Sequence, residues 1–250
     1  MSNNQIPMIQ ARGTYREVGK QIGKQAQTQI HSMLAYLREH VPAGFSWEQM
    51  VAHSKDYLAP SRVIYPQYIE ELEGVAEGSG VSFDDIYLSM CEELWESPVL
   101  HGCTDMAARG RATLDGTTLI AHTNDLALSS ESRLVILKIQ VGDEPEILAV
   151  SPGGVAISAG YNAARISLTG NQLDSNDVRP GVPRLLVVRA ILGSRALSEA
   201  MTHCLLPQRA SSYNNVIADA SGEVYSMEGS ATDLEAIYIE KDVMAHANHY

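Results

Sequence analysis

The stretch ESPVLHGCTDMAARG, Glu96 to Gly110, decides the fold because the hydrophobic pattern changes within it. Before it, apolar side chains recur at helical spacing. After it, β-branched runs alternate with glycine-containing turns. The sequence therefore predicts a helical segment over residues 1–102 and a strand-rich core over residues 103–250, together in one integrated domain.

The helical segment contains four predicted helices. Thr14 and Glu17 stand at the two positions of a capping box, which places a helix start there. Proline and glycine residues mark the ends of this and later helices. The predicted helices cover residues 14–40, 47–58, 65–80 with its end at Gly78 and Gly80, and a final stretch that begins at the N-cap Ser82.

The strand-rich core is predicted to consist of hairpins with one helical insertion. Asp115-Gly116 and Gly142-Asp143 are turn signals between apolar runs. A helix is predicted over residues 183–201, and strands return on both sides of the turn at 219–222. Helices, strands, helices and strands in that order favour an α+β fold with largely antiparallel sheets. The chain ends in an apolar, strand-like run, which predicts that further C-terminal sequence completes the sheet.

Composition narrows the class of protein. A net charge of -12 argues against a nucleic-acid partner, because phosphate binding needs clustered Lys and Arg. No apolar run approaches the roughly 20 residues that a membrane span needs, and no secretory signal is visible before the first predicted helix. The three cysteines form no CxxC pair, which favours free thiols in a reducing compartment. We therefore predict a cytoplasmic protein without membrane or nucleic-acid partners.

Cys103 is the strongest candidate for chemistry, although a small buried thiol in the core is the alternative. A thiol is a strong nucleophile only as the thiolate, so it needs a base. The base is a histidine in many enzymes, or the residue's own α-amine once the preceding peptide bond is cut. That amine has a reference pKa of about 7.7–8.0. Gly102 leaves its carbonyl open to attack, and Thr104 and Asp105 supply nearby polar groups.

Several stretches in a fixed order resemble one enzyme family. It is the acyl-CoA:6-aminopenicillanic acid acyltransferase group of N-terminal nucleophile (Ntn) hydrolases, with a more distant similarity to choloylglycine hydrolases and penicillin V acylases. The stretches are GTYREVGKQIGKQ (13–25), YPQYIEELEGVAEGSGVSFDDIYLSMCEEL (65–94), GCTD (102–105), DGTTLIAHTNDL (115–126), GYNAARISLTGNQL (160–173), and YSMEGS with HANHY (225–250).

The resemblance implies a four-layer αββα sandwich preceded by a helical segment. It implies a precursor that cuts its own Gly102–Cys103 bond into two associated chains. Cys103 would then attack a small amide or an acyl thioester and form a thioester that water or an amine resolves. No cofactor and no metal are implied, and acyl-CoA would enter only as a substrate.

The resemblance also assigns roles to individual residues. Asp125 matches the aspartate near the nucleophile's amine, and Asn248 matches the asparagine that holds the oxyanion. Asn171 matches a second oxyanion-region position. His122 stands where the distant relatives carry an arginine, which leaves that arginine's role open here. Turn or strand-edge chemistry is the alternative interpretation of Asp125 and both asparagines.

Other polar residues receive no catalytic role from the sequence. His246 and His249 lack a third partner at ligand spacing, so no metal site is predicted. Glu228 is interpreted as a buried carboxylate near the sheet, and Cys91 and Cys204 as core thiols. The glycines of GVAEGSG are interpreted as a helix C-cap and turn, not as a phosphate-binding loop.

Three functional hypotheses follow. The first is a self-processing cysteine amidohydrolase or acyltransferase, with hydrolysis and transfer not separable because both use the same acyl-enzyme. The second is a truncated, non-catalytic relative that binds a ligand or partner. The third is a conventional thiol enzyme without chain cleavage, with His101, His122 or His246 as the base.

Overall fold

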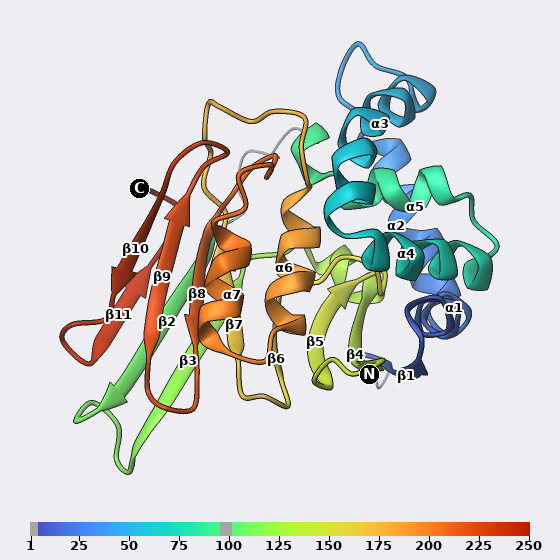
Figure 1. The fold of residues 1–250 in the computed structure, drawn as a ribbon. Helices are drawn as coiled ribbons and strands as arrows, with labels where there is room; N and C mark the ends of the chain where they lie inside the picture. The colour runs from blue at the N-terminus through green and yellow to red at the C-terminus, as the bar shows by residue number, and fades with distance from the viewer. Residues whose placement is uncertain (1–4, 96–101) are drawn as a thin grey trace.

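The computed structural model describes residues 5–95 and 102–250. Helices pack on one face of an eight-stranded sheet, and a three-stranded sheet packs on its other face (Figure 1). The predicted α+β class with stacked, mainly antiparallel sheets is confirmed. His101 lies outside the described residues.

The helical regions match the predicted positions, but two predicted helices are each divided into two. The break between α1 and α2 falls at Ala26, a fully buried residue with no proline beside it in the sequence. Tertiary packing therefore sets this break. The helices are α1 (Tyr15–Gln25), α2 (Gln27–Glu39), α3 (Trp47–Ile64), α4 (Pro66–Ser79), α5 (Phe83–Met90), α6 (Arg184–Gly193) and α7 (Leu197–Cys204), with short 3-10 turns η1 (Glu92–Leu94) and η2 (Leu128–Arg133).

Local sequence signals place two helix starts as predicted. The Thr14 backbone N–H donates to Glu17 Oε2 at 2.8 Å, and the Glu17 N–H donates to Thr14 Oγ1 at 3.4 Å, which completes the capping box. The Asp85 N–H donates to Ser82 Oγ at 3.1 Å. Each cap satisfies backbone donors that the helix itself leaves open.

Helices α1 and α4 cross with their backbones in contact. A Cβ built on Gly19 would lie 1.9 Å from the Glu71 carbonyl oxygen, and one on Gly74 would lie 2.2 Å from the Arg16 carbonyl oxygen. Only glycine permits this approach. The interpretation of GVAEGSG as a cap and turn was therefore wrong for Gly74 and Gly78, which lie inside α4. Gly80, at φ +72°, forms the left-handed cap.

The large sheet has the order β1-β4-β5-β6-β7-β8-β9-β10. Strand β1 runs parallel to β4, and all other neighbours are antiparallel. The predicted turns at 142–143 and 219–222 both join antiparallel neighbours. The strands are β1 (Met8–Gly13), β4 (Leu134–Val141), β5 (Ile147–Pro152), β6 (Ala159–Asn162), β7 (Ser167–Asn171), β8 (Asn214–Ala218), β9 (Val224–Gly229) and β10 (Leu234–Tyr238).

The small sheet has the order β11-β2-β3, from Val243–His246, Cys103–Gly110 and Gly116–Asn124. A small apolar core separates it from the large sheet, formed by Ala107, Val216, Ala218, Val224 and Ile239. Strand β2 begins at Cys103 itself, so the nucleophile candidate opens a strand at one end of the space between the two sheets.

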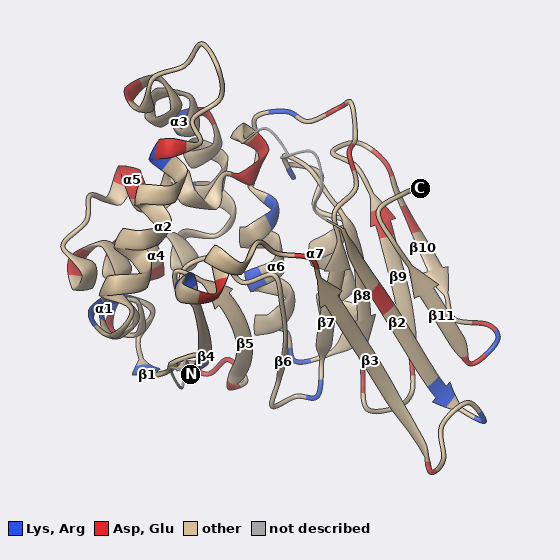
Figure 2. Cartoon of the chain, turned by 180° about the vertical axis from the view of Figure 1, so that it is seen from behind, with Lys and Arg blue, Asp and Glu red and all other residues tan. Residues whose placement is uncertain are grey.

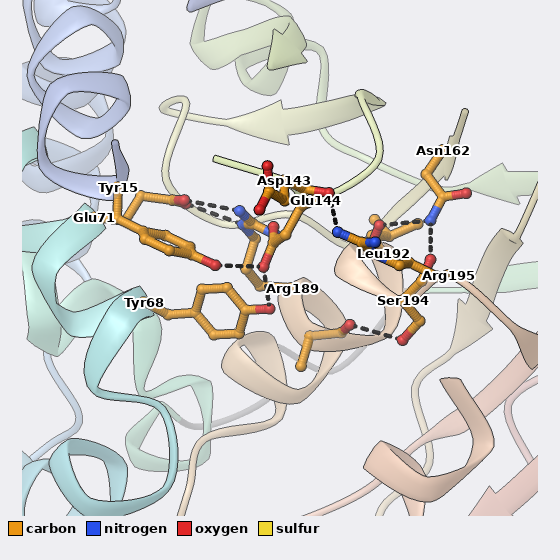
Figure 3. A network of polar contacts seen from close by, with 11 residues as sticks. Tyr15, Tyr68, Glu71, Asp143, Glu144, Asn162, Arg189, Leu192, Ser194 and Arg195 are labelled. Carbon is orange, nitrogen blue, oxygen red and sulfur yellow. Dashed lines mark hydrogen bonds and ion pairs between the residues drawn. The ribbon is translucent and has the colours of Figure 1, made fainter. Parts of the chain in front are cut away.

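A buried ion network joins the helical layer to the large sheet (Figure 3). Arg189 on α6 donates to Glu71 on α4 at 3.1 and 2.8 Å, and to Glu144, beside the β4–β5 turn, at 2.9 Å. The hydroxyls of Tyr15 and Tyr68 donate to Glu144 at 2.8 and 2.9 Å. The network thereby ties α1, α4, α6 and the β4–β5 turn to one another.

Charged residues are spread over both the helical and the strand parts of the chain (Figure 2). This distribution fits a solubility role for the acidic excess. Across residues 5–95 and 102–250, no helix is both long and apolar enough to cross a bilayer.

Candidate active site

Cys103 faces the interior between the sheets. Residues 103, 105 and 107 alternate as buried positions along β2, while Thr104 is exposed on the outer face. Cys103 is 9 % exposed, so the residue is largely enclosed. The structure therefore brings Asp105 to the same side as Cys103 and places Thr104 away from it.

Two asparagine amides converge on the Cys103 sulfur. Asn248 Nδ2 lies 3.0 Å from Sγ and Asn171 Nδ2 lies 3.3 Å from it. Asn248 also accepts the Cys103 backbone N–H through Oδ1 at 2.7 Å. Both predicted oxyanion residues thus meet the predicted nucleophile, one from the end of β7 and one from beyond β11. Donors in this arrangement stabilise negative charge at or beside the sulfur.

Asn248 is held at both ends of its amide. Its Nδ2 also donates to the Gln172 carbonyl oxygen at 2.8 Å, immediately after β7. The oxygen end faces a backbone donor and the nitrogen end faces acceptors, so the orientation of this amide is fixed by its partners.

Gly102 lies against both the backbone and the side chain of Asp125. The Asp125 backbone N–H donates to the Gly102 carbonyl oxygen at 2.8 Å. A Cβ on Gly102 would lie 2.5 Å from Asp125 Oδ2. The carboxylate predicted to serve the nucleophile's amine region therefore lies against the residue before the nucleophile, and it fills the space that a side chain at 102 would need.

His122 and Asp105 form a cross-strand pair between β3 and β2. His122 Nδ1 lies 2.8 Å from Asp105 Oδ1. Asp105 is 1 % exposed, and its Oδ2 is buried without a hydrogen-bond partner among the residues the structure describes. The His122 ring is thus engaged two residues away from the nucleophile.

A polar row on the large sheet faces the small sheet. Asn171, Asn214 and Glu228 are in register across β7, β8 and β9. Asn214 Nδ2 donates to Asn171 Oδ1 at 3.4 Å, and Ser226 Oγ donates to Asn214 Oδ1. Sequence reasoning missed Asn214 and Ser226. The available signal was an asparagine pair inside an otherwise β-branched strand, where asparagine is depleted.

His246 connects this row to the small sheet. Its Nε2 lies 2.6 Å from Glu228 Oε2, and its Nδ1 lies 3.1 Å from Asn171 Oδ1. The histidine considered from sequence as a base or a weak metal ligand therefore contacts the amide that contacts Cys103. Within the described residues, no group of three or more His, Cys, Asp or Glu side chains is arranged to hold a metal ion.

Residues 112–250 match the family described as acyl-coenzyme A:6-aminopenicillanic acid acyl-transferase. The match covers more than half of the chain and includes both asparagines that contact Cys103. The chain belongs to this acyl-transferase family. The resemblance inferred from its motifs is thereby confirmed.

One curated protein that is similar to this chain is the β-alanyl-dopamine/carcinine hydrolase of Drosophila melanogaster. The two are 22 % identical over 225 residues, which cover 78 % of this chain and 56 % of the relative. The chain thus spans about half the length of the relative that it matches.

Solved structures of Ntn hydrolases are similar at lower levels of identity. The Caenorhabditis elegans N-acylethanolamine-hydrolyzing acid amidase ortholog is 14 % identical, with a TM-score of 0.44 over 59 % of this chain and 70 % of that one. A mutant of the conjugated bile acid hydrolase from Clostridium perfringens is 10 % identical, with a TM-score of 0.45 over 59 % and 53 %. Penicillin V acylase from Agrobacterium tumefaciens is 13 % identical, with a TM-score of 0.35 over 57 % and 43 %.

The other two thiols of the chain, those of Cys91 and Cys204, have different surroundings from the Cys103 thiol. Cys91 is fully buried and Cys204 is 1 % exposed, and neither forms a disulfide. Burial raises the pKa of the Cys91 thiol well above its usual value, and burial raises the pKa of Cys204 to about 12. Both thiols therefore stay protonated and unreactive near neutral pH.

A cavity of about 750 Å³ opens beside Glu228. Its walls come from the segment after β7, from β9 and β10, and from the C-terminal Tyr250. The carboxylates that line it are Asp174, Asp177, Glu228, Asp233 and Glu235. It is a space next to the polar row in which a small molecule has room to bind.

Proposed function

We propose that this chain is a self-processing cysteine amidohydrolase or acyltransferase with Cys103 as its N-terminal nucleophile. The observation that carries the proposal is the convergence of two amide N–H donors on the Cys103 sulfur, at 3.0 and 3.3 Å. A core thiol gains little from such donors, whereas a nucleophile that develops negative charge gains a great deal. The family match supports acyl transfer, and the curated relative, a hydrolase, supports hydrolysis.

Self-cleavage begins with attack of the Cys103 sulfur on the Gly102 carbonyl carbon. The C–N bond breaks as the acyl group moves from nitrogen to sulfur, and water then hydrolyses the thioester. The products are the Gly102 carboxylate and the free α-amine of Cys103. The Asp125 N–H, 2.8 Å from the Gly102 carbonyl oxygen, is positioned to stabilise that oxygen as it becomes negative.

The mature nucleophile then acts on an exogenous substrate. The Cys103 α-amine takes the thiol proton, and its reference pKa of about 7.7–8.0 suits a base at neutral pH. Asn248 Oδ1, which accepts a hydrogen bond from the Cys103 nitrogen at 2.7 Å, orients this amine. The thiolate attacks the substrate carbonyl carbon, and the amine returns its proton to the leaving group.

The asparagine donors stabilise the tetrahedral intermediate. When a substrate carbonyl lies against Cys103, its oxygen can take the Nδ2 donors of Asn248 and Asn171 that now point to the sulfur. One such donor contributes about 2.7–4 kcal/mol of transition-state stabilisation. Water or an amine then attacks the thioester, which gives hydrolysis or transfer. The proposed steps use side chains and the α-amine of this chain and call on no metal or cofactor.

The substrate class we propose is a small amide or an acyl thioester such as an acyl-CoA. β-Alanyl amides are the first substrates to examine, because the Drosophila relative is named for them. A cytoplasmic location also stays a prediction, supported by three unpaired cysteines.

The two alternative functions are less well supported. A conventional Cys–His enzyme needs an imidazole directed at the sulfur, but the contacts of His122 and His246 go to Asp105, Glu228 and Asn171. A non-catalytic binding protein does not require amide donors around a thiol. In the experiment below, a non-catalytic binding protein predicts no acyl group on Cys103. A Cys–His enzyme predicts an acyl group on Cys103 of an uncut chain, whereas the proposal predicts it on a chain cut between Gly102 and Cys103.

The experiment is acyl-enzyme trapping. The purified chain is mixed with β-alanyl, neutral and anionic amides and with acyl-CoA, quenched in acid, and examined by peptide mass spectrometry. The proposal predicts an acyl group on Cys103, and none on Cys91 or Cys204. The Cys103→Ala variant should release no product. Turnover that persists in Cys103→Ala, or a wild-type chain that forms neither adduct nor product across the panel, would overturn the proposal.

A further inference from the structure

The side-chain amide of Asn171 must keep its Nδ2 toward Cys103 and its Oδ1 away from it. It is fully buried, its Nδ2 lies 3.3 Å from the Cys103 sulfur, and its Oδ1 faces two other side chains. Rotation of the amide by 180° would direct the carbonyl oxygen at the sulfur and repel a thiolate. The useful orientation therefore depends on what contacts Oδ1.

His246 is the closer of the two groups that contact Oδ1. The His246 Nδ1 contact measures 3.1 Å, whereas the Asn214 Nδ2 contact measures 3.4 Å. The shorter contact supports the orientation only if Nδ1 carries a proton. If Nδ1 lacked the proton, its lone pair would face Oδ1, and the flipped amide would be preferred.

Glu228 contacts the other nitrogen of that ring. Its Oε2 lies 2.6 Å from His246 Nε2, so a carboxylate faces one ring nitrogen while a carbonyl oxygen faces the other. A carbonyl oxygen only accepts, so the contact with Asn171 is a hydrogen bond when Nδ1 carries a proton. The other titratable neighbours of the ring are Asp105, its cross-strand partner on β2, and His249, stacked at 6.2 Å.

We propose that Glu228 and His246 form a positioning pair that holds the Asn171 amide with its N–H toward Cys103. The inference rests on the proposed function, because it assigns a purpose to the orientation of a donor at the nucleophile. The contacts run in order from Glu228 to His246, to Asn171 and to the Cys103 sulfur. Neither member of the pair touches the reacting atoms, so each acts through Asn171.

The pair also bridges the two sheets, since His246 lies on β11 and Glu228 on β9. A purely structural clamp between sheets is therefore the competing explanation. A clamp would stabilise the fold without regard to which atom faces Asn171. The positioning role instead depends on a donor at the place of Nδ1, and this difference makes the two explanations separable.

The test uses three variants of the chain. His246→Asn keeps an N–H donor near the position of Nδ1 and loses the contact with Glu228. His246→Leu removes both contacts at similar size. Glu228→Gln removes the charge but keeps a polar partner. Each variant is compared with wild type at the same processing state, and its unfolding free energy is measured by urea denaturation.

Two measurements report on the N–H donor at the position of His246 Nδ1 and not on the stability of the fold. One is the rate of Cys103 alkylation by iodoacetamide at fixed pH, read from the peptide mass. The other is kcat and KM for an amide that acylates Cys103. We expect His246→Leu to lower the alkylation rate and kcat roughly 10-fold or more, the size of a lost hydrogen bond to a charged group, with KM nearly unchanged. His246→Asn should recover most of both rates, and Glu228→Gln should fall between.

Two results would overturn the positioning role. One is wild-type alkylation and kcat in His246→Leu. The other is a His246→Asn variant as slow as His246→Leu although folded. Failure of the proposed function has a different signature, namely amide turnover that survives Cys103→Ala. In that case the alkylation rates still decide whether the pair orients Asn171.

Discussion

The two faces of the large sheet carry two polar networks with opposite designs. On the helix side, Arg189 meets Glu71 and Glu144, and two tyrosine hydroxyls also donate to Glu144 (Figure 3). On the other side, the donors of Asn171 and Asn248 converge on one sulfur. The first network holds two carboxylates with one guanidinium and two hydroxyl donors, whereas the second aims its donors at an atom whose charge changes during a reaction.

We expect the first network to contribute mainly to fold stability and the second mainly to catalysis. A buried ion network loses much stability when one member is removed, because its partners keep their charge without solvent. Donors aimed at a nucleophile add little to the folded ground state and much to a transition state. Variants in the ion network should therefore lower the unfolding free energy with little effect on turnover per folded molecule. Variants in the asparagine donors should lower turnover with little effect on the unfolding free energy.

The largest effect is expected at the nucleophile itself. Cys103→Ala should abolish both the Gly102–Cys103 cut and acyl-enzyme formation, because no other group in the proposed mechanism can form the thioester. Cys204→Ala is the matched control, and its folded fraction should keep full activity per molecule. Intact mass and substrate turnover measure both outcomes. Residual turnover in Cys103→Ala above background would mean that another residue carries the reaction.

Arg189→Met tests the other network. We expect a loss of about 3–5 kcal/mol in unfolding free energy, because Glu71 stays buried and Glu144 half-buried without their cation. The exposed pair of Arg62 and Glu73 supplies the control, and Arg62→Met should cost no more than about 1 kcal/mol. Urea denaturation measures both. Equal stability losses in the two variants would show that the Arg189 network contributes no more than an exposed ion pair.

Asn248→Ala should show the reverse pattern. Its side chain is exposed at the edge of the site, so unfolding free energy should change little. Loss of its donor should lower kcat about 10²–10³-fold. Asn176→Ala, at a second exposed asparagine in the cavity wall, should leave kcat nearly unchanged. A loss of stability in Asn248→Ala that matches its loss of kcat would contradict a catalytic donor.

Gly102→Val should slow self-cleavage without unfolding the chain. The added Cβ would lie 2.5 Å from Asp125 Oδ2, so the carboxylate has to move. Local strain of about 1–3 kcal/mol corresponds to a rate lower by roughly 5- to 150-fold. Gly102→Ala should give a smaller decrease. The rate of fragment appearance by mass spectrometry measures both, and a wild-type rate in the valine variant would show that the space at 102 is unimportant.

Glu93 should give the smallest effect, one visible as a pH dependence of stability. Burial, followed by the neighbouring Glu92, raises the pKa of Glu93 from 4.5 to about 7. Because the folded pKa lies above the unfolded one, its contribution is fully present below about pH 4.5 and is lost as pH rises through about 7.

Glu93→Gln should remove that slope, so stability should fall less between about pH 5 and 7 than in wild type. The backbone N–H of Arg184 and the hydroxyl of Ser211 can still donate to the amide oxygen, at the positions now 2.8 and 2.7 Å from Oε1. Thermal unfolding across this pH range tests the difference, and parallel curves for the two proteins would exclude Glu93 as the titrating group.

Sequence reasoning located the parts of the site that local motifs specify. Cys103, Asn171 and Asn248 were predicted from the resemblance, and the structure brings all three together. The capping box at Thr14 and the turn at 142–143 depend on neighbouring residues only, which is why they could be predicted.

Features that depend on distant partners could not be predicted. The pairing of His246 with Glu228 requires β11 and β9 to lie on facing sheets, and no spacing in the sequence specifies that. The parallel partnership of β1 with β4 sets Met8 beside Ile136, far apart along the chain. The break at Ala26 likewise reflects packing and no local signal.

The central claim is that Cys103 becomes an N-terminal residue by the chain's own chemistry. The most direct measurement is the intact mass of freshly purified protein beside Cys103→Ala. Self-cleavage predicts two fragments divided between Gly102 and Cys103, whose masses sum to the precursor plus one water, and a single uncut chain in the variant. A single uncut chain in both proteins, or the same two fragments in Cys103→Ala, would contradict it.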